Sequence, residues 1–163
     1  MRYGLPIAII TGALIVFGLW WEENRSLTTS ESALFSRLDE ATSNSPPDGM
    51  DVIAAFDLPA DCKPKTCYKR NGQIEGLRYR KADLRQPEEG LILVIDKFSG
   101  TCIRTDRVQD YFSAGDPEQS CFDATCWYIR SQREWGILTF EVEAPNSPCV
   151  SSAVINSLPE WRN

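Results

Sequence analysis

The N-terminal part of the chain is an apolar stretch that differs from the mixed pattern after it. No charged residue occurs from Leu5 to Trp21. As a helix, the stretch from Tyr3 to Trp21 would be about 28 Å long, close to the thickness of the hydrocarbon core of a bilayer. We therefore expect residues 1–22 to form a single transmembrane anchor.

Charges on either side of this stretch predict its orientation. Arg2 precedes it, whereas Glu22 and Glu23 follow it, and positively charged flanks stay in the cytoplasm. We expect a single-pass protein of the inner (plasma) membrane, with the bulk of the chain on the periplasmic, extracytoplasmic side. A cleaved signal peptide is the alternative, although the segment GLWWEEN lacks small residues at the spacing that a signal peptidase needs.

A helical pattern follows the anchor. Thr28 with Glu31 three residues later has the spacing of a capping box. Apolar residues then continue at helical intervals at Leu34, Phe35, Leu38 and Ala41. This predicts a juxtamembrane helix over about residues 28–42, which the proline-rich segment SNSPPDG ends. We assign residues 23–47 to this helix and its linker, and we expect the globular domain at residues 48–163.

Residues 48–101 have the pattern of a short helix followed by strands. Asp48 can cap a helix whose Val52, Ile53 and Phe56 share one face. The segment NGQIEGLRYR combines a turn signal at Asn71-Gly72 with alternating apolar residues, and LILVIDKF is an apolar run of strand length. This first module is thus a helix followed by two or three strands.

Residues 102–148 repeat the pattern. Thr105 is the expected cap of a helix with a buried stripe of Val108, Tyr111 and Phe112. The segment CWYIRSQREWGILTFEVE predicts a hairpin, and its Leu138, Phe140 and Val142 should face the same side. The residues Val150, Val154, Leu158 and Trp161 then recur at helical spacing and predict a C-terminal helix.

Six cysteines follow the anchor, and four of them form a duplicated motif. The motif is CKPKTC at Cys62 to Cys67 and CFDATC at Cys121 to Cys126, each copy between a helical pattern and strand-like sequence. An even number of cysteines in an oxidising compartment implies disulfides. The repeat predicts the pairs Cys62 with Cys67, Cys121 with Cys126, and Cys102 with Cys149, although other pairings stay open.

Together these patterns predict an α+β fold. Tandem helix-plus-hairpin repeats should form one antiparallel sheet with helices on one face, stapled by disulfides behind the single N-terminal transmembrane helix. The chain has 163 residues, and each module alone would bury too little surface to fold independently. We therefore expect one domain built from two modules.

Composition removes several classes of function. The formal net charge of −6 argues against nucleic acid and anionic lipid as partners. The chain has no histidine, so the commonest zinc ligand and the usual general base are missing, and we expect no metal, no cofactor and no catalytic residue. A redox role for a cysteine pair is the enzymatic alternative, but Cys62 and Cys121 follow their helices, whereas reactive thiols usually lie at helix N-termini or beside cations.

The second module carries a resemblance to known families. The residues that carry it are Thr105, Val108, Phe112, Gly115, Pro117, Trp127, Tyr128, Leu138, Thr139 and Phe140. This pattern resembles the SmpA/OmlA-type module of small envelope lipoproteins and the repeat of β-lactamase-inhibitor-protein-like folds. The first module resembles it more loosely, through Val52, Phe56, Pro59, Tyr68 and the strand LILVIDKFSG. The resemblance implies the fold and the binding of proteins in the bacterial envelope, but this chain lacks the lipoproteins' acylated cysteine.

The aromatic residues of the second hairpin are the candidate binding residues. They are Trp127, Tyr128 and Trp135, and such side chains are favoured as interface anchors. Trp135 lies near the hairpin turn, so we expect it to be more exposed than Trp127. The sequence thus predicts a non-catalytic, membrane-anchored exported module that binds another protein of the cell envelope. An immunity or inhibitor protein that neutralises an exported toxic enzyme is the alternative, and a thiol-disulfide oxidoreductase follows it.

Overall fold

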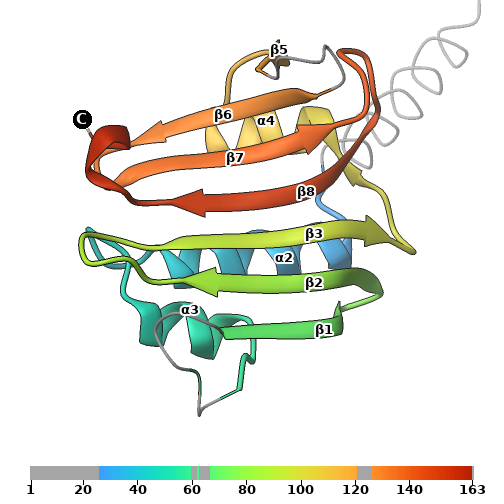
Figure 1. Ribbon diagram of the computed structural model, residues 1–163. Helices are drawn as coiled ribbons and strands as arrows, with labels where there is room; N and C mark the ends of the chain where they lie inside the picture. Colours follow the sequence, from blue (N-terminus) through green and yellow to red (C-terminus); the bar gives the residue numbers. More distant parts are fainter. Residues whose placement is uncertain (1–25, 60–61, 63–66, 121–125, 163) are drawn as a thin grey trace, which may run out of the picture.

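The computed structural model of the chain (Figure 1) describes residues 26–59, 62, 67–120 and 126–162. The predicted membrane anchor, residues 1–22, lies outside this part of the chain. Among the helices of the described residues, none is both long enough and apolar enough to cross a bilayer.

One antiparallel sheet of eight strands forms the centre of the fold (Figure 1). The strands are β1 (Cys67–Ile74), β2 (Leu77–Arg85), β3 (Ile92–Ser99), β4 (Ile103–Arg104), β5 (Glu118–Gln119), β6 (Trp127–Arg133), β7 (Gly136–Val142) and β8 (Cys149–Asn156). Their order across the sheet is β1-β2-β3-β8-β7-β6-β5, and β4 pairs with β8 off this path. The predicted α+β class with one antiparallel sheet is therefore confirmed.

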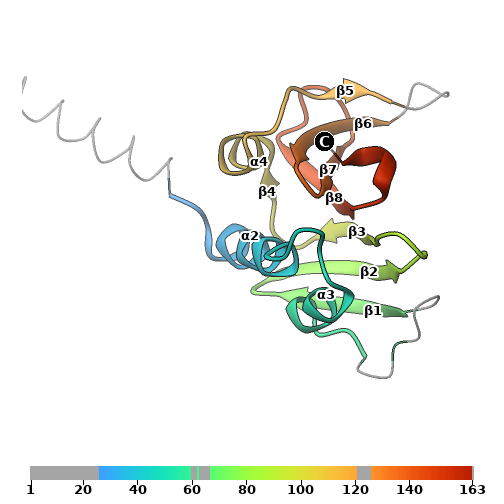
Figure 2. The same cartoon turned by 90° about the vertical axis from the view of Figure 1, so that its left-hand side faces the viewer.

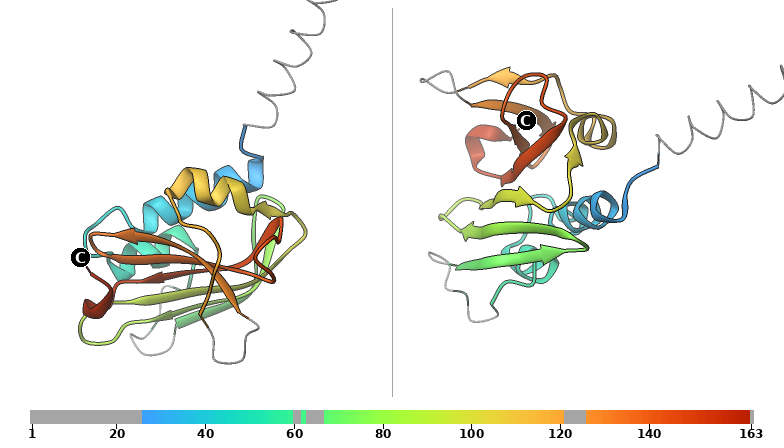
Figure 3. Two further views of the ribbon diagram at one scale, coloured as in Figure 1. Left: turned by 90° about the horizontal axis from the view of Figure 1, so that it is seen from above. Right: turned by 90° about the vertical axis from the view of Figure 1, so that its right-hand side faces the viewer.

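The α-helices of the described residues lie on one face of this sheet (Figures 2 and 3). They are α2 (Thr29–Ala41), α3 (Gly49–Ala55) and α4 (Thr105–Phe112), and a short 3-10 helix, η1 (Pro159–Trp161), follows β8. Helices α2 and α3 lie against the half formed by β1 to β3, and α4 lies against the half formed by β6 to β8 (Figure 2). The hydrophobic core fills the space between these helices and the sheet.

Helix α2 begins as the sequence predicts and belongs to this core. The Thr28 hydroxyl accepts a hydrogen bond from the Glu31 amide at 3.2 Å, and the Glu31 carboxylate accepts one from the Thr28 amide at 2.8 Å. The apolar residues Leu34, Phe35, Leu38 and Ala41 are buried in the same cluster as the strands. The folded domain therefore includes this helix and extends well before residue 48, where we expected it to start.

In both halves of the sheet, a helix precedes a three-stranded meander, although the short β5 also lies between α4 and β6. Helix α3 precedes the meander β1, β2 and β3, and helix α4 precedes the meander β6, β7 and β8. The halves join where β3 pairs with β8, with Val94 opposite Val154 and Ile95 opposite Ala153. This central pairing makes one continuous sheet from two local meanders.

Residues 149–156 form strand β8, so the predicted C-terminal helix is wrong. Val150, Val154 and Leu158 do recur at helical spacing, but the segment also contains Ile155, and its β-branched residues favour strands. The decisive cause lies outside the segment, because β8 pairs with β3 on one side and β7 on the other. A helix here would leave the facing edges of both strands without hydrogen-bond partners.

The turn of the first hairpin also differs from the prediction. It lies at Glu75 and Gly76, which both adopt positive φ angles of 41° and 87°. Two-residue turns of this kind match the twist of a hairpin. The predicted turn residue Gly72 lies inside β1 instead, where a Cβ atom would come within 1.9 Å of the Tyr79 ring. That glycine therefore makes room for a buried aromatic side chain.

Helices α3 and α4 differ in how their N-termini are capped. Asp48 caps α3 as predicted, because its carboxylate accepts a hydrogen bond from the Met50 amide at 2.6 Å. Thr105 does not cap α4, since it is the first helical residue and its hydroxyl donates to the Ser147 carbonyl at 2.7 Å. Val108 and Phe112 are buried as expected, whereas Tyr111 is 44% exposed.

Two of the predicted disulfides are confirmed. Cys62 is bonded to Cys67, and Cys102 is bonded to Cys149 across a separation of 47 residues. The second bond ties the segment before α4 to the first residue of β8, next to the pairing of β4 with β8. The third predicted pair, Cys121 with Cys126, includes a residue outside the described part of the chain and stays a prediction.

Candidate protein-binding surface

The structure separates the aromatic residues that the sequence grouped together. Trp135 lies between β6 and β7, but it packs into the core and only 9% of its surface is exposed. Trp127 is half-buried against the same core. The expectation that Trp135 is the more exposed of the two is therefore wrong. The reason is that the hairpin end lies against α2, since Trp135 borders a small cavity of about 210 Å³ together with Asp39 and Thr42.

Tyr128 lies on the opposite side of β6 from these core contacts. Its neighbour Ile129 is fully buried, and successive residues of a strand face opposite sides of the sheet. The Arg130 guanidinium lies 5.9 Å from the centre of the Tyr128 ring, which is within the range of a cation–π contact. Of the three predicted binding residues, Tyr128 is thus the one that faces away from the helices.

No α-helix of the described residues covers that side of the sheet (Figure 3). The strand register defines one row across it, which consists of Tyr68, Asp83, Val94, Val154, Thr139 and Arg130. The adjacent row consists of Ala82, Ile95, Ala153, Phe140 and Ile129, which are all fully buried beneath the helices. We call the side that carries the first row the open face.

The open face has an aliphatic centre and charged margins. Val94 and Val154 are paired partners at its middle and are both half-buried. On β2, Asp83 forms ion pairs with Lys81 at 2.7 Å and Arg85 at 3.2 Å. At the other margin, Arg130 pairs with Glu118 at 2.6 Å. An apolar centre inside a polar rim is the usual anatomy of a protein interface.

Asp83 is a titratable group of this rim with a perturbed pKa. Burial alone would raise the pKa of its carboxyl group, but hydrogen bonds from Lys81 and Arg85 outweigh burial and lower the pKa below its ordinary value. A carboxyl group with a lowered pKa in the folded state stabilises the protein above its unfolded pKa. That stability is lost as the pH falls through the folded value.

We therefore expect Asp83→Asn to lower the free energy of unfolding near neutral pH by about 1 kcal/mol or less, because solvent screens these ion pairs. The difference between the two proteins should shrink as the pH falls below about 4, where the carboxyl group becomes protonated. Denaturant unfolding at several pH values measures this difference. A difference that stays constant from neutral to strongly acidic pH would contradict the assignment.

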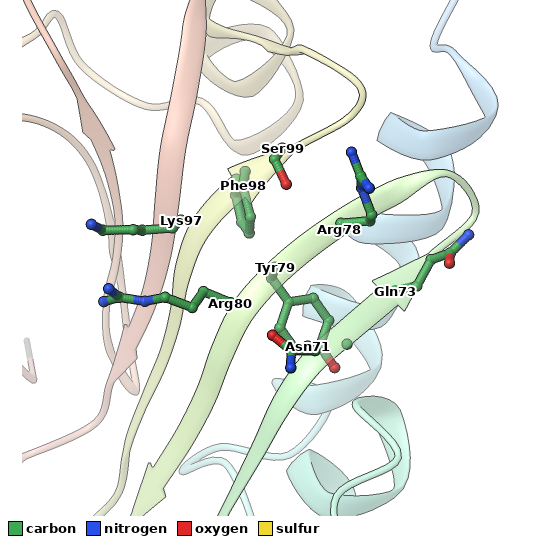
Figure 4. A pocket seen from close by; sticks show the side chains of 9 residues that line it. Asn71, Gln73, Arg78, Tyr79, Arg80, Lys97, Phe98 and Ser99 are labelled. Atoms are coloured by element: carbon green, nitrogen blue, oxygen red, sulfur yellow. The ribbon is translucent and has the colours of Figure 1, made fainter.

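A basic pocket of about 540 Å³ lies near the turn between β1 and β2 (Figure 4). Its lining includes three cationic side chains, Arg78, Arg80 and Lys97, and Figure 4 shows Arg80 and Lys97 extending in the same direction. Arg80 pairs with Asp96. Asn71 on β1 and Lys97 on β3 adopt positive φ angles of 53° and 56°, which interrupt the regular alternation of both strands. This cluster was not expected from the sequence, although the alternating arginines of RYR, Arg78 and Arg80, were its visible signal.

Comparison of the chain with models of known protein families, with curated proteins and with solved structures finds no match. The resemblance to envelope lipoprotein and inhibitor modules therefore stays a prediction. Within the part of the chain that the structure describes, no group of three or more histidine, cysteine, aspartate or glutamate side chains is placed to hold a metal ion.

Proposed function

We propose that this chain is a non-catalytic module that binds another protein of the cell envelope through its open face. The observation that carries the proposal is the asymmetry of the sheet: helices cover one face, and the other presents half-buried valines between charged margins. Exposed aromatic area supports it as well, because Tyr68 is 48% exposed at the β1 edge of that face. Such side chains are enriched at protein interfaces.

The proposal also covers where the protein lies in the cell and how its two halves arose. The apolar N-terminal stretch supports a membrane anchor, and the two disulfides support an oxidising, extracytoplasmic compartment. The helix-then-meander order that the two halves share supports an origin as tandem repeats. We place the module on the periplasmic side of the inner membrane on these grounds.

An immunity or inhibitor protein is the second candidate. The net charge of −6 favours it, because an acidic protein complements the basic cleft of many nucleic-acid-degrading enzymes. The open face itself carries charges of both signs, and the basic pocket adds the cations Arg78, Arg80 and Lys97 near one end. This local charge pattern fits a general protein-binding module better than an inhibitor that occupies the basic cleft of an enzyme. A thiol-disulfide oxidoreductase ranks below both.

Placing a charge at the centre of the open face should weaken binding strongly. We expect Val154→Lys to reduce partner capture at least tenfold, because a lysine there puts an unpaired charge into the apolar middle of the interface. Thermal stability should change little, because position 154 is only half-buried and the long aliphatic part of a lysine side chain can carry the ammonium group into solvent. The measurement is affinity capture of the full chain from solubilised membranes, with the co-purified proteins quantified by mass spectrometry.

Met50→Lys is the matched control, because Met50 is 68% exposed on α3, on the helix side of the sheet. A protein partner of the open face should be lost with Val154→Lys and retained with Met50→Lys. Equal capture by both variants would show that the open face is not the binding surface. Capture of a secreted enzyme that loses its activity on binding would favour the inhibitor candidate instead.

A further inference from the structure

Positive charge is concentrated on the strands of the first half of the sheet. Strands β1 to β3 carry seven cationic side chains and two carboxylates, whereas β6 to β8 carry two cations and one carboxylate. One of the seven, Lys69, lies opposite the buried Ala82 and pairs with Asp57, so it belongs to the helix side. The whole chain has a net charge of −6, so the excess on β1 to β3 is opposite in sign to the rest of the protein. A local excess of this kind attracts a partner of complementary charge.

One row of charged residues lies beside the row that defines the open face. Arg70 is opposite Lys81, and Lys81 is opposite Asp96. Each of these residues is two positions along its strand from a residue of the first row, so both rows face the same side of the sheet. Arg80 pairs with Asp96, which places its guanidinium group on this side as well.

The basic pocket and the far end of β2 add further cations. Arg78 and Lys97 line the pocket together with Arg80 (Figure 4). Arg85 pairs with Asp83 of the open face. We call the six cations of this surface the basic half, and they are Arg70, Arg78, Arg80, Lys81, Arg85 and Lys97.

The two carboxylates of these strands do not neutralise all six cations. Each carboxylate is already in an ion pair with other members of the basic half. Arg70, Arg78 and Lys97 are exposed and form no ion pair with any residue that the structure describes. These three cations are therefore available to carboxylates of a partner, which a guanidinium group binds through paired hydrogen bonds.

The cations of the basic half are spread too widely for one small anion to contact them all. Arg78 and Arg85 lie near the two ends of β2, and their separation in sequence corresponds to about 23 Å along a strand. An extended peptide of about seven residues spans the same distance. The ligand that fits this distribution of charge is therefore a chain with several negative groups.

Apolar surface and carboxylates among the cations distinguish an acidic peptide from a uniformly charged polyanion. The Tyr68 ring is 48% exposed, and its centre lies 5.5 Å from the Arg70 guanidinium and 5.2 Å from the Lys81 ammonium group. Asp83 and Asp96 also lie among the cations and would repel a chain with a phosphate at every position. A peptide avoids this repulsion, because it can place neutral residues beside these carboxylates and apolar residues against the ring.

We propose that the basic half binds an extended acidic segment of the partner protein. Carboxylates of that segment pair with Arg70, Arg78 and Lys97, and its apolar side chains lie against Tyr68 and Val94. The existence of a protein partner comes from the proposed function, on which this assignment rests, whereas the acidic character of the segment follows from the charges of β1 to β3.

The test measures peptide binding to the purified full chain in uncharged maltoside micelles by fluorescence anisotropy. The probe is a labelled peptide of alternating glutamate and valine, about eight residues long and thus about 26 Å when extended. It should bind, whereas the same peptide with lysine in place of glutamate should not. A peptide of glutamate alone should bind more weakly, because it lacks the apolar contacts.

Paired substitutions separate this surface from general electrostatic attraction. Arg78→Gln combined with Lys97→Gln should lower the affinity for the probe about fivefold or more, since two exposed charge pairs are lost. Arg78→Lys combined with Lys97→Arg keeps both charges and should retain binding. Arg104→Gln combined with Arg130→Gln is the matched control, because it removes the same charge outside the basic half. The control should bind like the natural protein, and the unfolding temperature of each variant verifies that it is folded.

Several outcomes would overturn the proposal. Unchanged binding by the variant that lacks Arg78 and Lys97, or an equal loss in the control, would remove the basic half as the site. Tighter binding of single-stranded DNA, or displacement of the probe by phosphatidylglycerol in the micelles, would make a nucleic acid or a lipid surface the occupant. A dimer in analytical ultracentrifugation that dissociates in the same variant would make the occupant a second copy of this chain.

Affinity capture from solubilised membranes separates this proposal from the proposed function. A partner that is lost both with Val154→Lys and with the variant lacking Arg78 and Lys97 supports both. A partner that is lost with Val154→Lys alone would overturn the acidic segment and leave the open face as the binding surface. Loss with the other variant alone would support the acidic segment and overturn the apolar centre as the binding surface.

Discussion

Replacing Phe35 by alanine should lower the free energy of unfolding by about 3–5 kcal/mol, the usual cost of removing a large buried aromatic side chain. Phe35 is fully buried on α2. The centre of its ring lies 4.8 Å from that of Tyr111 and 5.0 Å from that of Phe112. Phe112 in turn contacts Phe140 of β7, with ring centres 5.3 Å apart. One side chain thus connects α2 to α4 and to the second half of the sheet.

Urea unfolding of the purified chain measures this loss. Met50→Ala is the control, because Met50 is 68% exposed on the neighbouring helix α3 and its replacement should change stability by about 0.5 kcal/mol or less. A Phe35→Ala protein as stable as the control would mean that α2 does not fold cooperatively with the sheet. The domain would then begin near residue 48, as the sequence pattern alone suggested.

Elements whose signals are local could be predicted from the sequence. The capping box of Thr28 and Glu31 fixes the start of α2, and Asp48 fixes the start of α3. The alternation of Leu138, Phe140 and Val142 also predicts the buried side of β7 correctly. In each case the residues that allow the prediction also make the interactions of the element, so neighbouring residues alone are sufficient.

Elements that depend on distant partners were predicted wrongly. The spacing of Val150, Val154 and Leu158 fits a helix, and only the open edges of β3 and β7 make the segment a strand. Trp135 was expected at the surface because it lies near a turn, but α2 approaches that turn from almost a hundred positions earlier in the chain. Neither effect is visible in a window of neighbouring residues.

The candidate binding surface also depends on residues that are distant in the sequence. Trp127 and Tyr128 are adjacent in sequence, and the sequence grouped them, yet the sheet places them on opposite faces. The open face could be assembled only from the strand order, because its central valines come from β3 and β8, which are far apart in the chain. Arg107 illustrates the limit most clearly. Its spacing from Asp110 is typical of a solvated helix surface, and only the structure shows that its Nε and Nη2 atoms are buried without a hydrogen-bond partner among the described residues.

Removing the Cys102–Cys149 disulfide should lower the free energy of unfolding by about 4 kcal/mol in the chain-entropy model. The bond closes a loop of 47 residues that contains α4 and the hairpin of β6 and β7. In the folded protein its ends stay together without the bond, because Arg104 pairs with Cys149 in the sheet. The bond therefore acts mainly by restricting the unfolded chain, and its effect should grow with the length of the loop.

The Cys62–Cys67 disulfide provides the matched comparison. It spans only five residues, and the same model gives it about 2 kcal/mol, half the effect of the long loop. Each pair should be replaced by alanines in a separate variant and unfolded in denaturant without reductant, after mass spectrometry confirms that the other bonds are intact. Equal losses in the two variants would show that native contacts around the bonds, and not loop length, set their contribution. A loss about twice as large for Cys102 and Cys149 would show that the length of the loop closed by each bond sets its contribution.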